Sequence, residues 1–172
     1  MSIAETLLQD FDHEMHGTRR TLARIPDAES TRTFRPHEKS MAMGRLAAHV
    51  STLPQLVPLF FDRDHLEAPG PDWPPNLEFV STAKLLADFD RLTALARPAL
   101  ASATDDSLNA TWQFSYGGHK AVEAKRSLVY RTTFFNHLLH HRAQLGVYLR
   151  LNHVPVPGLY GPSADEVFQP IK

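Results

Sequence analysis

The chain has 172 residues, with 18 Lys and Arg against 19 Asp and Glu and no cysteine. Its length, with 42% hydrophobic and 22% charged residues, fits one globular domain spanning residues 1–172 and excludes a disordered chain. The formal net charge of −1 excludes a strongly basic nucleic-acid-binding protein, and the absence of cysteine excludes disulfides, cysteine-ligated zinc and a thiol nucleophile.

The sequence also bears on membrane association. No run of apolar residues reaches the roughly 18 residues that a membrane-spanning helix needs. The N-terminal segment is charged from Glu5 onward and lacks the apolar run of a secretory signal. We therefore expect a cytoplasmic protein with no membrane partner, in which any catalysis uses side chains other than cysteine, a metal or a cofactor.

The first predicted element is a helix over residues 2–25. Apolar residues recur there at steps of three and four, which is the helical period. Ser2 and Glu5 form a capping-box pattern, and Pro26 is expected to end the helix. Residues 27–39 are expected to form a loop.

A second helix is predicted from Ser40, the expected N-cap, to about residue 61. Its apolar residues again follow the helical period, but Pro54 and Pro58 lie inside it, so we expect a kink or a broken middle. Residues 68–75 are rich in proline and glycine and are predicted to be a linker.

The second half of the chain predicts two more helices and a hairpin. Ser81 or Thr82 is expected to cap a helix that runs to about residue 100. Alternating aromatic and polar residues followed by a Gly-Gly pair predict a short hairpin around residues 111–122. The last helix is predicted over residues 127–151, followed by an extended tail. Four long helices with modest connections predict an all-α fold, a helical bundle.

Ten histidines are a high number for this length and give the first functional indication. His137 and His141 lie one turn apart on the last predicted helix, so they project from nearly one face toward the expected core. His49 lies among apolar residues of the second helix. Neutral imidazole is a good ligand for several divalent transition metals, and three protein ligands leave a position open for water or substrate, as in catalytic zinc sites.

The same histidines allow a plainer interpretation. A pair of histidines one turn apart also arises by chance in a histidine-rich chain, and a single core histidine is more often a hydrogen-bonded packing residue than a ligand. The HExxH motif of zinc proteases, the glycine-rich phosphate loops and the serine nucleophile elbow are all absent. The remaining histidines are expected at the surface or at a subunit contact: His13, His16, His65, His119 and His153.

The opening LLQDFDHEMHGTRRTLARIPD, the segment FRPHEKSMAMGRLAAHV and the segment NHLLHHRAQLGVYLRLNHVPVPGLYGPSADE resemble the DinB/YfiT-like superfamily of bacterial metalloenzymes. The resemblance covers nearly the whole chain and is most distinctive from His137 to Glu166.

The resemblance implies a DinB-like up-down-down-up four-helix bundle that forms a homodimer. It also implies one divalent metal, such as Zn, Ni or Fe, bound by a histidine of the second helix and two histidines of the last long helix, which here match His49, His137 and His141. His140 is taken as non-ligating, because the spacing favours His137 with His141. Some members of the superfamily transfer low-molecular-weight thiols and others are maleylpyruvate isomerases, so the fold does not fix the reaction.

Two functions follow as hypotheses. The first is a metal-dependent enzyme that activates a low-molecular-weight thiol or a water for transfer to an electrophilic small molecule. Its candidate helper residues are Tyr148, for which core packing is the alternative, and Arg142 or His37 for an anionic group. The second is a non-catalytic, stress-associated metal-binding dimer. Nucleic acid is not expected as a partner of either, because the chain lacks a basic stripe.

Overall fold

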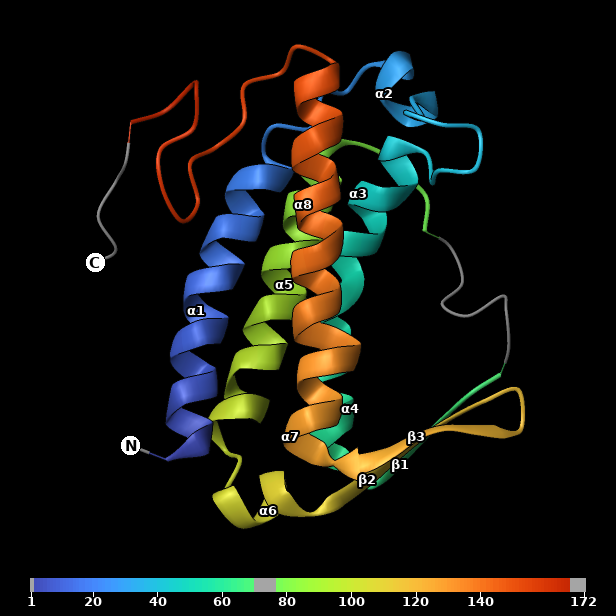
Figure 1. Ribbon diagram of the computed structural model, residues 1–172, viewed down its shortest axis with the longest axis vertical. Helices are drawn as coiled ribbons and strands as arrows, with labels where there is room; N and C mark the ends of the chain where they lie inside the picture. The colour runs from blue at the N-terminus through green and yellow to red at the C-terminus, as the bar shows by residue number, and fades with distance from the viewer. Residues whose placement is uncertain (1, 70–76, 168–172) are drawn as a thin grey trace.

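The computed structural model describes residues 2–69 and 77–167, and this part of the chain is mostly helical (Figure 1). Four long helical segments lie side by side. α1 and α8 run in one direction, and the segment α3–α4 and the helix α5 run in the opposite direction. Their bounds are α1 Ile3–Leu22, α3 Met43–Thr52, α4 Leu56–Asp62, α5 Thr82–Ala101 and α8 Asn136–Leu151.

The first helix begins as the sequence predicts. The Ser2 backbone N–H donates to Glu5 Oε2 over 2.6 Å, and the Glu5 backbone N–H donates to Ser2 Oγ over 3.1 Å. This capping box satisfies backbone groups that have no partner within the helix. Ser81 likewise caps α5 by accepting a bond from the Lys84 N–H.

The second predicted helix is divided, and its predicted start is wrong. It begins at Met43 with Ala42 as N-cap and no side-chain cap, rather than at Ser40. The predicted break is confirmed: α3 gives way to a 3-10 turn, η1 Leu53–Gln55, which contains Pro54, before α4 begins. Proline removes a backbone donor and its ring crowds the preceding turn, so the regular helix stops there.

Two short helices lie where the sequence predicted irregular structure. α2 Glu29–Thr33 interrupts the expected loop, and α6 Asp105–Asn109 follows α5, with Thr104 as its cap. Helices of five residues carry too little periodicity to be recognised from sequence. Of the predicted linker over 68–75, Ala68 ends a strand, and residues 70–75 lie outside the described part of the chain.

The prediction of an all-α fold is wrong in one respect, because the structure contains a small three-stranded sheet. The predicted hairpin is present as β2 Thr111–Tyr116 and antiparallel β3 His119–Lys125, turning through Gly117 and Gly118 at φ of +56° and +79°. Positive φ at both turn positions favours glycine. The unpredicted strand β1 His65–Ala68 pairs in parallel with β2.

The sheet is attached to the helices through Trp112 of β2. Its side chain is fully buried, its ring lies 5.0 Å from that of Phe60 of α4, and its Nε1 donates to the Arg63 carbonyl over 2.8 Å. Burying an aromatic ring while its N–H has a partner combines a large hydrophobic gain with a satisfied polar group.

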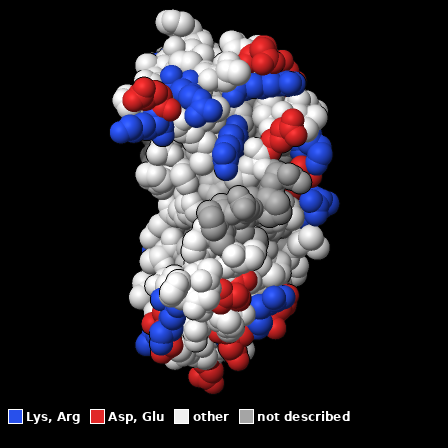
Figure 2. Space-filling model, turned by 90° about the vertical axis from the view of Figure 1, so that its right-hand side faces the viewer, with Lys and Arg blue, Asp and Glu red and all other residues white. Residues whose placement is uncertain are grey.

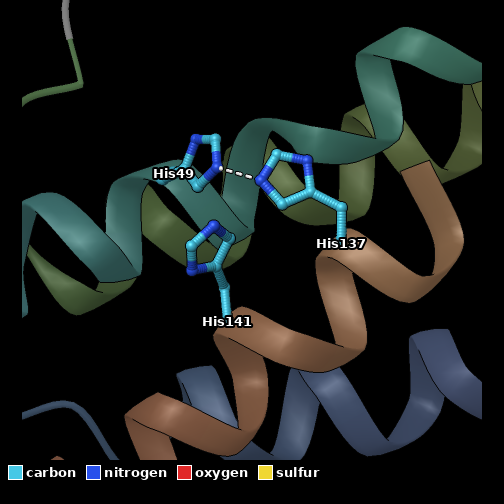
Figure 3. A group of neighbouring side chains, drawn as sticks. All are labelled: His49, His137 and His141. Atoms are coloured by element: carbon cyan, nitrogen blue, oxygen red, sulfur yellow. Dashed lines mark hydrogen bonds between the residues drawn. The ribbon is translucent and has the colours of Figure 1, made fainter. Parts of the chain in front are cut away.

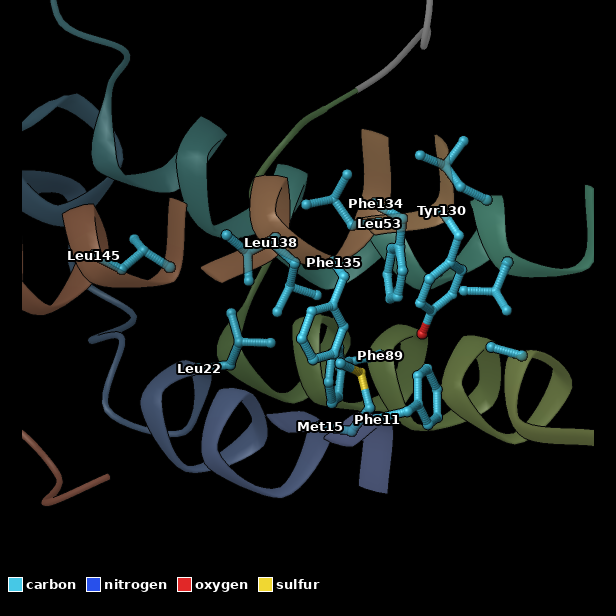
Figure 4. Packing of buried hydrophobic residues seen from close by; sticks show 14 of the residues in the cluster. Phe11, Met15, Leu22, Leu53, Phe89, Tyr130, Phe134, Phe135, Leu138 and Leu145 are labelled. Carbon is cyan, nitrogen blue, oxygen red and sulfur yellow. The ribbon is translucent and has the colours of Figure 1, made fainter. Parts of the chain in front are cut away.

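An aromatic core fixes the last helix against the others (Figure 4). α8 is preceded by α7 Arg126–Val129 and a π-helical turn, η2 Tyr130–Phe135. In that turn Phe134 is fully buried, and its ring lies 6.2 Å from Phe11 of α1. Leu138 and Leu145 of α8 are also fully buried. These contacts set the rotation of α8 about its axis, and therefore which of its residues face α3. Among the described residues, no helix combines the length and hydropathy of a membrane-spanning segment.

The close packing of α3 yields the first prediction. A Cβ at Gly44 would lie 2.9 Å from Phe79 Cβ, closer than real Cβ contacts, and 3.1 Å from the Arg32 Cα, which is a tight contact with backbone. We expect Gly44→Ala to destabilise the protein by about 1–3 kcal/mol, because the neighbours or the helix must shift. Chemical denaturation measures the change in the free energy of unfolding.

Gly146→Ala is the matched control. The nearest atom to a Cβ there is Val156 Cγ1 at 3.9 Å, an ordinary contact. Inside a helix this change should stabilise by about 0.5–1 kcal/mol. Equal effects of the two substitutions would contradict the close approach at Gly44.

Candidate metal centre

Three histidines from two helices come together in space (Figure 3). His49 lies on α3, and His137 and His141 lie one turn apart on α8. One nitrogen from each ring can be chosen so that all three lie within 4.8 Å of one another. Among residues 2–69 and 77–167, no other cluster of three or more potential ligands from His, Asp and Glu is found.

Hydrogen bonds outside the cluster fix the tautomers of two rings. His137 Nδ1 lies 3.1 Å from the Thr133 carbonyl, which can only accept, so Nδ1 carries the proton. His141 Nδ1 lies 2.7 Å from Gln144 Oε1 and donates in the same way. Each ring therefore has an unprotonated Nε2 that can bind a metal, an outer-shell arrangement common to metal-binding histidines. In His137 this nitrogen accepts a hydrogen bond from His49 Nε2.

The spacing of the nitrogens fits a metal ion. His49 Nε2 and His137 Nε2 are 3.1 Å apart. Two nitrogens bound to one tetrahedral metal at about 2.0–2.1 Å lie roughly 3.3 Å apart, so this pair needs little adjustment. The three ligand nitrogens as a set lie within 4.8 Å of one another. His49 differs from the other two rings, because its buried Nδ1 has no hydrogen-bond partner among the described residues. Packing around α3 therefore orients this ring.

All three rings are neutral at neutral pH, which is the form that binds metal. Burial lowers the pKa of His49 from 6.5 to about 4, with further lowering by His141, His137 and Arg45. Burial is also the main reason that the pKa values of His137 and His141 are lowered, against the opposing effect of their hydrogen bonds. Taking a charged imidazolium out of water is costly, so burial favours the neutral ring.

The local structure before His137 is unusual. The π-helical turn η2 ends at Phe135, one residue before α8 begins, and it contains Thr133, whose carbonyl accepts the His137 proton. Single π turns within longer helices are rare and are frequent at functional sites. Here the turn places the backbone acceptor that orients a candidate ligand.

The structure does not bring the other predicted site residues to this cluster. Tyr148 is buried, donates to the Met41 carbonyl over 3.2 Å and packs its ring against Phe34, as in the packing alternative. His37 is exposed in the loop before α3, where its Nδ1 accepts the Lys39 N–H. His140 is exposed and makes an edge contact with the His141 ring, outside the group of three.

Arg142 lies in a buried ion pair that the sequence analysis missed. Its guanidinium contacts Glu14 Oε2 at 2.6 Å and donates to the Glu14 carbonyl and to Thr18 Oγ1, all on α1. It also contacts the hydroxyl of Tyr160, which donates to Glu14 over 2.8 Å. The Arg142 guanidinium, which was predicted to bind an anionic group of a substrate, is instead paired with Glu14. Its contacts tie α8 to α1 and to the C-terminal segment.

The remaining histidines lie apart from the cluster. His65 Nε2 contacts Ser115 Oγ at 3.2 Å across β1 and β2, and the His13 ring lies 6.2 Å from that of Tyr160. His16, His119 and His153 are exposed, in agreement with the surface positions predicted for them.

The fold and the cluster together define a class: a mostly helical protein in which two helices gather three neutral histidines. The DinB family model matches residues 1–170, and the chain belongs to the DinB family. A DinB-like protein from Bacillus cereus has the same fold, with a TM-score of 0.65 and 23% sequence identity over 92% of this chain and 98% of that one. Among curated proteins, none matches.

The lowered pKa of His49 yields a prediction for the metal-free protein. Between pH 4 and 6.5 the unfolded chain binds more protons than the folded one, so stability rises with pH through this window and is lost on acidification. His49 alone should contribute a loss of up to about 3 kcal/mol on going from pH 7 to pH 4. Denaturant titrations of chelator-treated protein at several pH values measure this.

His49→Gln separates this effect from general acid destabilisation. The amide does not titrate, so the variant should lose less stability on acidification than the wild type. His140→Gln removes an exposed histidine and should follow the wild type. If His49→Gln and the wild type lose the same amount, the assigned shift is wrong.

The buried ion pair yields a second prediction. Arg142→Met leaves the Glu14 carboxylate buried without its cation and should destabilise the protein by about 3–5 kcal/mol. The double variant Glu14→Gln with Arg142→Met should recover part of this loss. Arg97→Met, which removes an exposed pair with Asp12, should have little effect. Thermal and chemical unfolding of the four proteins decide whether Arg142 has a structural role.

Proposed function

We propose that this DinB family protein is a metal-dependent enzyme that transfers a low-molecular-weight thiol or a water to an electrophilic small molecule. The observation that carries the proposal is the convergence of three neutral imidazoles, from His49, His137 and His141, within 4.8 Å. No carboxylate joins them among the described residues.

The composition of the cluster favours a reactive site over a structural one. Structural zinc sites are closed by four protein ligands, whereas catalytic sites use three and keep a position open. Three nitrogen donors without thiolate or carboxylate suit Zn²⁺, Ni²⁺ or Fe²⁺. A divalent ion held by these histidines would lower the pKa of a bound thiol or water, so that the nucleophilic form is available near neutral pH.

The chain's own residues would hold that site rigid. Thr133 and Gln144 fix the orientation and the tautomer of the two α8 rings. Burial keeps all three rings neutral, so protons do not compete with a metal at neutral pH. The absence of cysteine is compatible with thiol chemistry, because the thiol would come from a cosubstrate.

The alternative is a stress-associated dimer that binds a metal without turnover. It uses the same three ligands and predicts that no small molecule enters the fourth position. The homodimer and the cytoplasmic location stay predictions from the sequence. A cobalt-substituted protein whose visible spectrum is unchanged by azide, imidazole and thiols would favour this alternative.

Metal content tests the proposal. Wild-type protein without a tag, incubated with Zn²⁺, Ni²⁺ or Fe²⁺ and then freed of excess metal, should carry about one ion per chain by plasma mass spectrometry. His49→Ala removes one of the three ligands and should lower metal affinity at least tenfold.

His140→Ala is the matched control, because it removes an exposed histidine beside the cluster and should retain the metal. A wild-type chain that stays empty with all three metals would overturn the metal centre. Equal metal loss in both variants would show that the ligands are assigned wrongly.

A further inference from the structure

The solvent-facing part of α3 is a narrow stripe that includes a candidate ligand. From Met43 to Ser51 every residue of this helix is buried except Arg45, and Thr52 after them is half-buried. His49 is 9% exposed and lies between Arg45, one turn before it, and Thr52, one turn after it. Residues four apart on a helix are neighbours on one face, about 5–6 Å apart at their Cβ atoms. Arg45 is therefore the accessible cation next to the histidines on α3.

The two ends of this stripe differ in what they offer a ligand. Thr52 Oγ1 donates back to the carbonyls of Ala48 and His49, so its proton is already used. Arg45 makes no ion pair among the described residues. The lack of an ion pair is unusual for an arginine of this chain, because nine of the thirteen arginines form one. The paired arginines are Arg19, Arg20, Arg24, Arg32, Arg91, Arg97, Arg126, Arg142 and Arg150.

No carboxylate of the described residues joins the cluster, and none is a cause of the lowered pKa values of the three rings. The groups that act on them are the rings themselves, His140 and Arg45. A divalent ion on three neutral ligands would keep its full charge, and Arg45 adds a further positive charge one helical turn away. Figure 2 shows charged side chains of both signs interspersed towards the two ends of one face. Attraction of an anion to the cluster would therefore come from individually placed charges rather than from a broad basic surface.

We infer that Arg45 is a specificity-determining residue that binds the carboxylate of a small-molecule ligand held at the three histidines. This inference rests on the proposed function, because the ligand is the molecule that would occupy the open position. A guanidinium binds a carboxylate through two parallel hydrogen bonds, which fixes orientation as well as charge. The spacing of one helical turn selects molecules in which a few bonds separate the donor atom from the carboxylate.

The test compares two thiols that differ in a carboxylate. Cobalt-loaded protein is titrated with 3-mercaptopropionate and with 2-mercaptoethanol, and binding is followed by the sulfur-to-cobalt charge-transfer absorption. The wild type should prefer 3-mercaptopropionate by about tenfold, which is the effect of one charge-assisted contact at an exposed site. Arg45→Gln should lower the ratio of the two dissociation constants to the smaller value that the charge of the metal ion alone supplies, and Arg45→Lys should keep part of the contribution of Arg45. Raising the salt concentration should weaken the preference of the wild type, because the contact is exposed.

Arg63→Gln is the control, because it removes an exposed arginine that also lacks an ion pair among the described residues but lies after α4, away from His49. It should keep the wild-type preference. If the wild type does not bind cobalt, the proposed metal centre fails, and the inference with it. If cobalt binds but Arg45→Gln keeps the preference, or the wild type has none, the inference about Arg45 fails while the metal centre stands. Cobalt binding without any response to either thiol overturns the thiol as a ligand and this role of Arg45.

Discussion

The packing of α8 against α1 and the aromatic core is the constraint on which the candidate site depends. Leu138 and Leu145 are fully buried and lie seven residues apart, so they occupy nearly the same face of the helix. Once that face is committed to the core, the neighbouring face, which carries His137 and His141, must look toward α3. His49 meets them there because the rest of α3 is buried almost all round. Apolar packing, rather than attraction between the histidines, therefore gathers the three imidazoles.

That packing also decides their protonation. A ring enclosed on several sides loses hydration, and the charged form loses more than the neutral one, so the pKa falls. In His137 and His141 the bonds to Thr133 and Gln144 act in the opposite direction but do not offset burial. The fold thus holds three neutral imidazoles close together. Their nitrogens can bind a metal, and their lowered pKa values disfavour protonation. A histidine that only packs in the core does not require two further histidines beside it, so the cluster favours a metal centre over the packing interpretation.

Much of this could be predicted from periodicity, and the failures have physical causes. The spacing of His137 and His141, the apolar setting of His49, the capping box at Ser2 and the break at Pro54 are all local signals. The strand β1 was missed because its parallel pairing with β2 joins segments far apart in the chain, and parallel pairing leaves no turn motif. Arg142 was placed near the site although it follows His141 directly, and adjacent helical residues differ by about 100°. That rotation directs it to α1, where Glu14 is buried.

The division of α8 into faces bears on how such a site distinguishes its ligands. One face of α8 carries the candidate metal ligands, and the next carries the core leucines. Arg142 ties the helix to α1 through Glu14. The positive charge of Arg142, which follows His141 in the chain, is therefore already neutralised. A set of three neutral ligands would leave the whole charge of a divalent ion to attract any anion, whatever its shape. Discrimination among anions must then come from residues at the rim of the site. On α3 the exposed rim residue is Arg45, which has no ion-pair partner among the described residues, so a change there would alter ligand choice while leaving all three metal ligands in place.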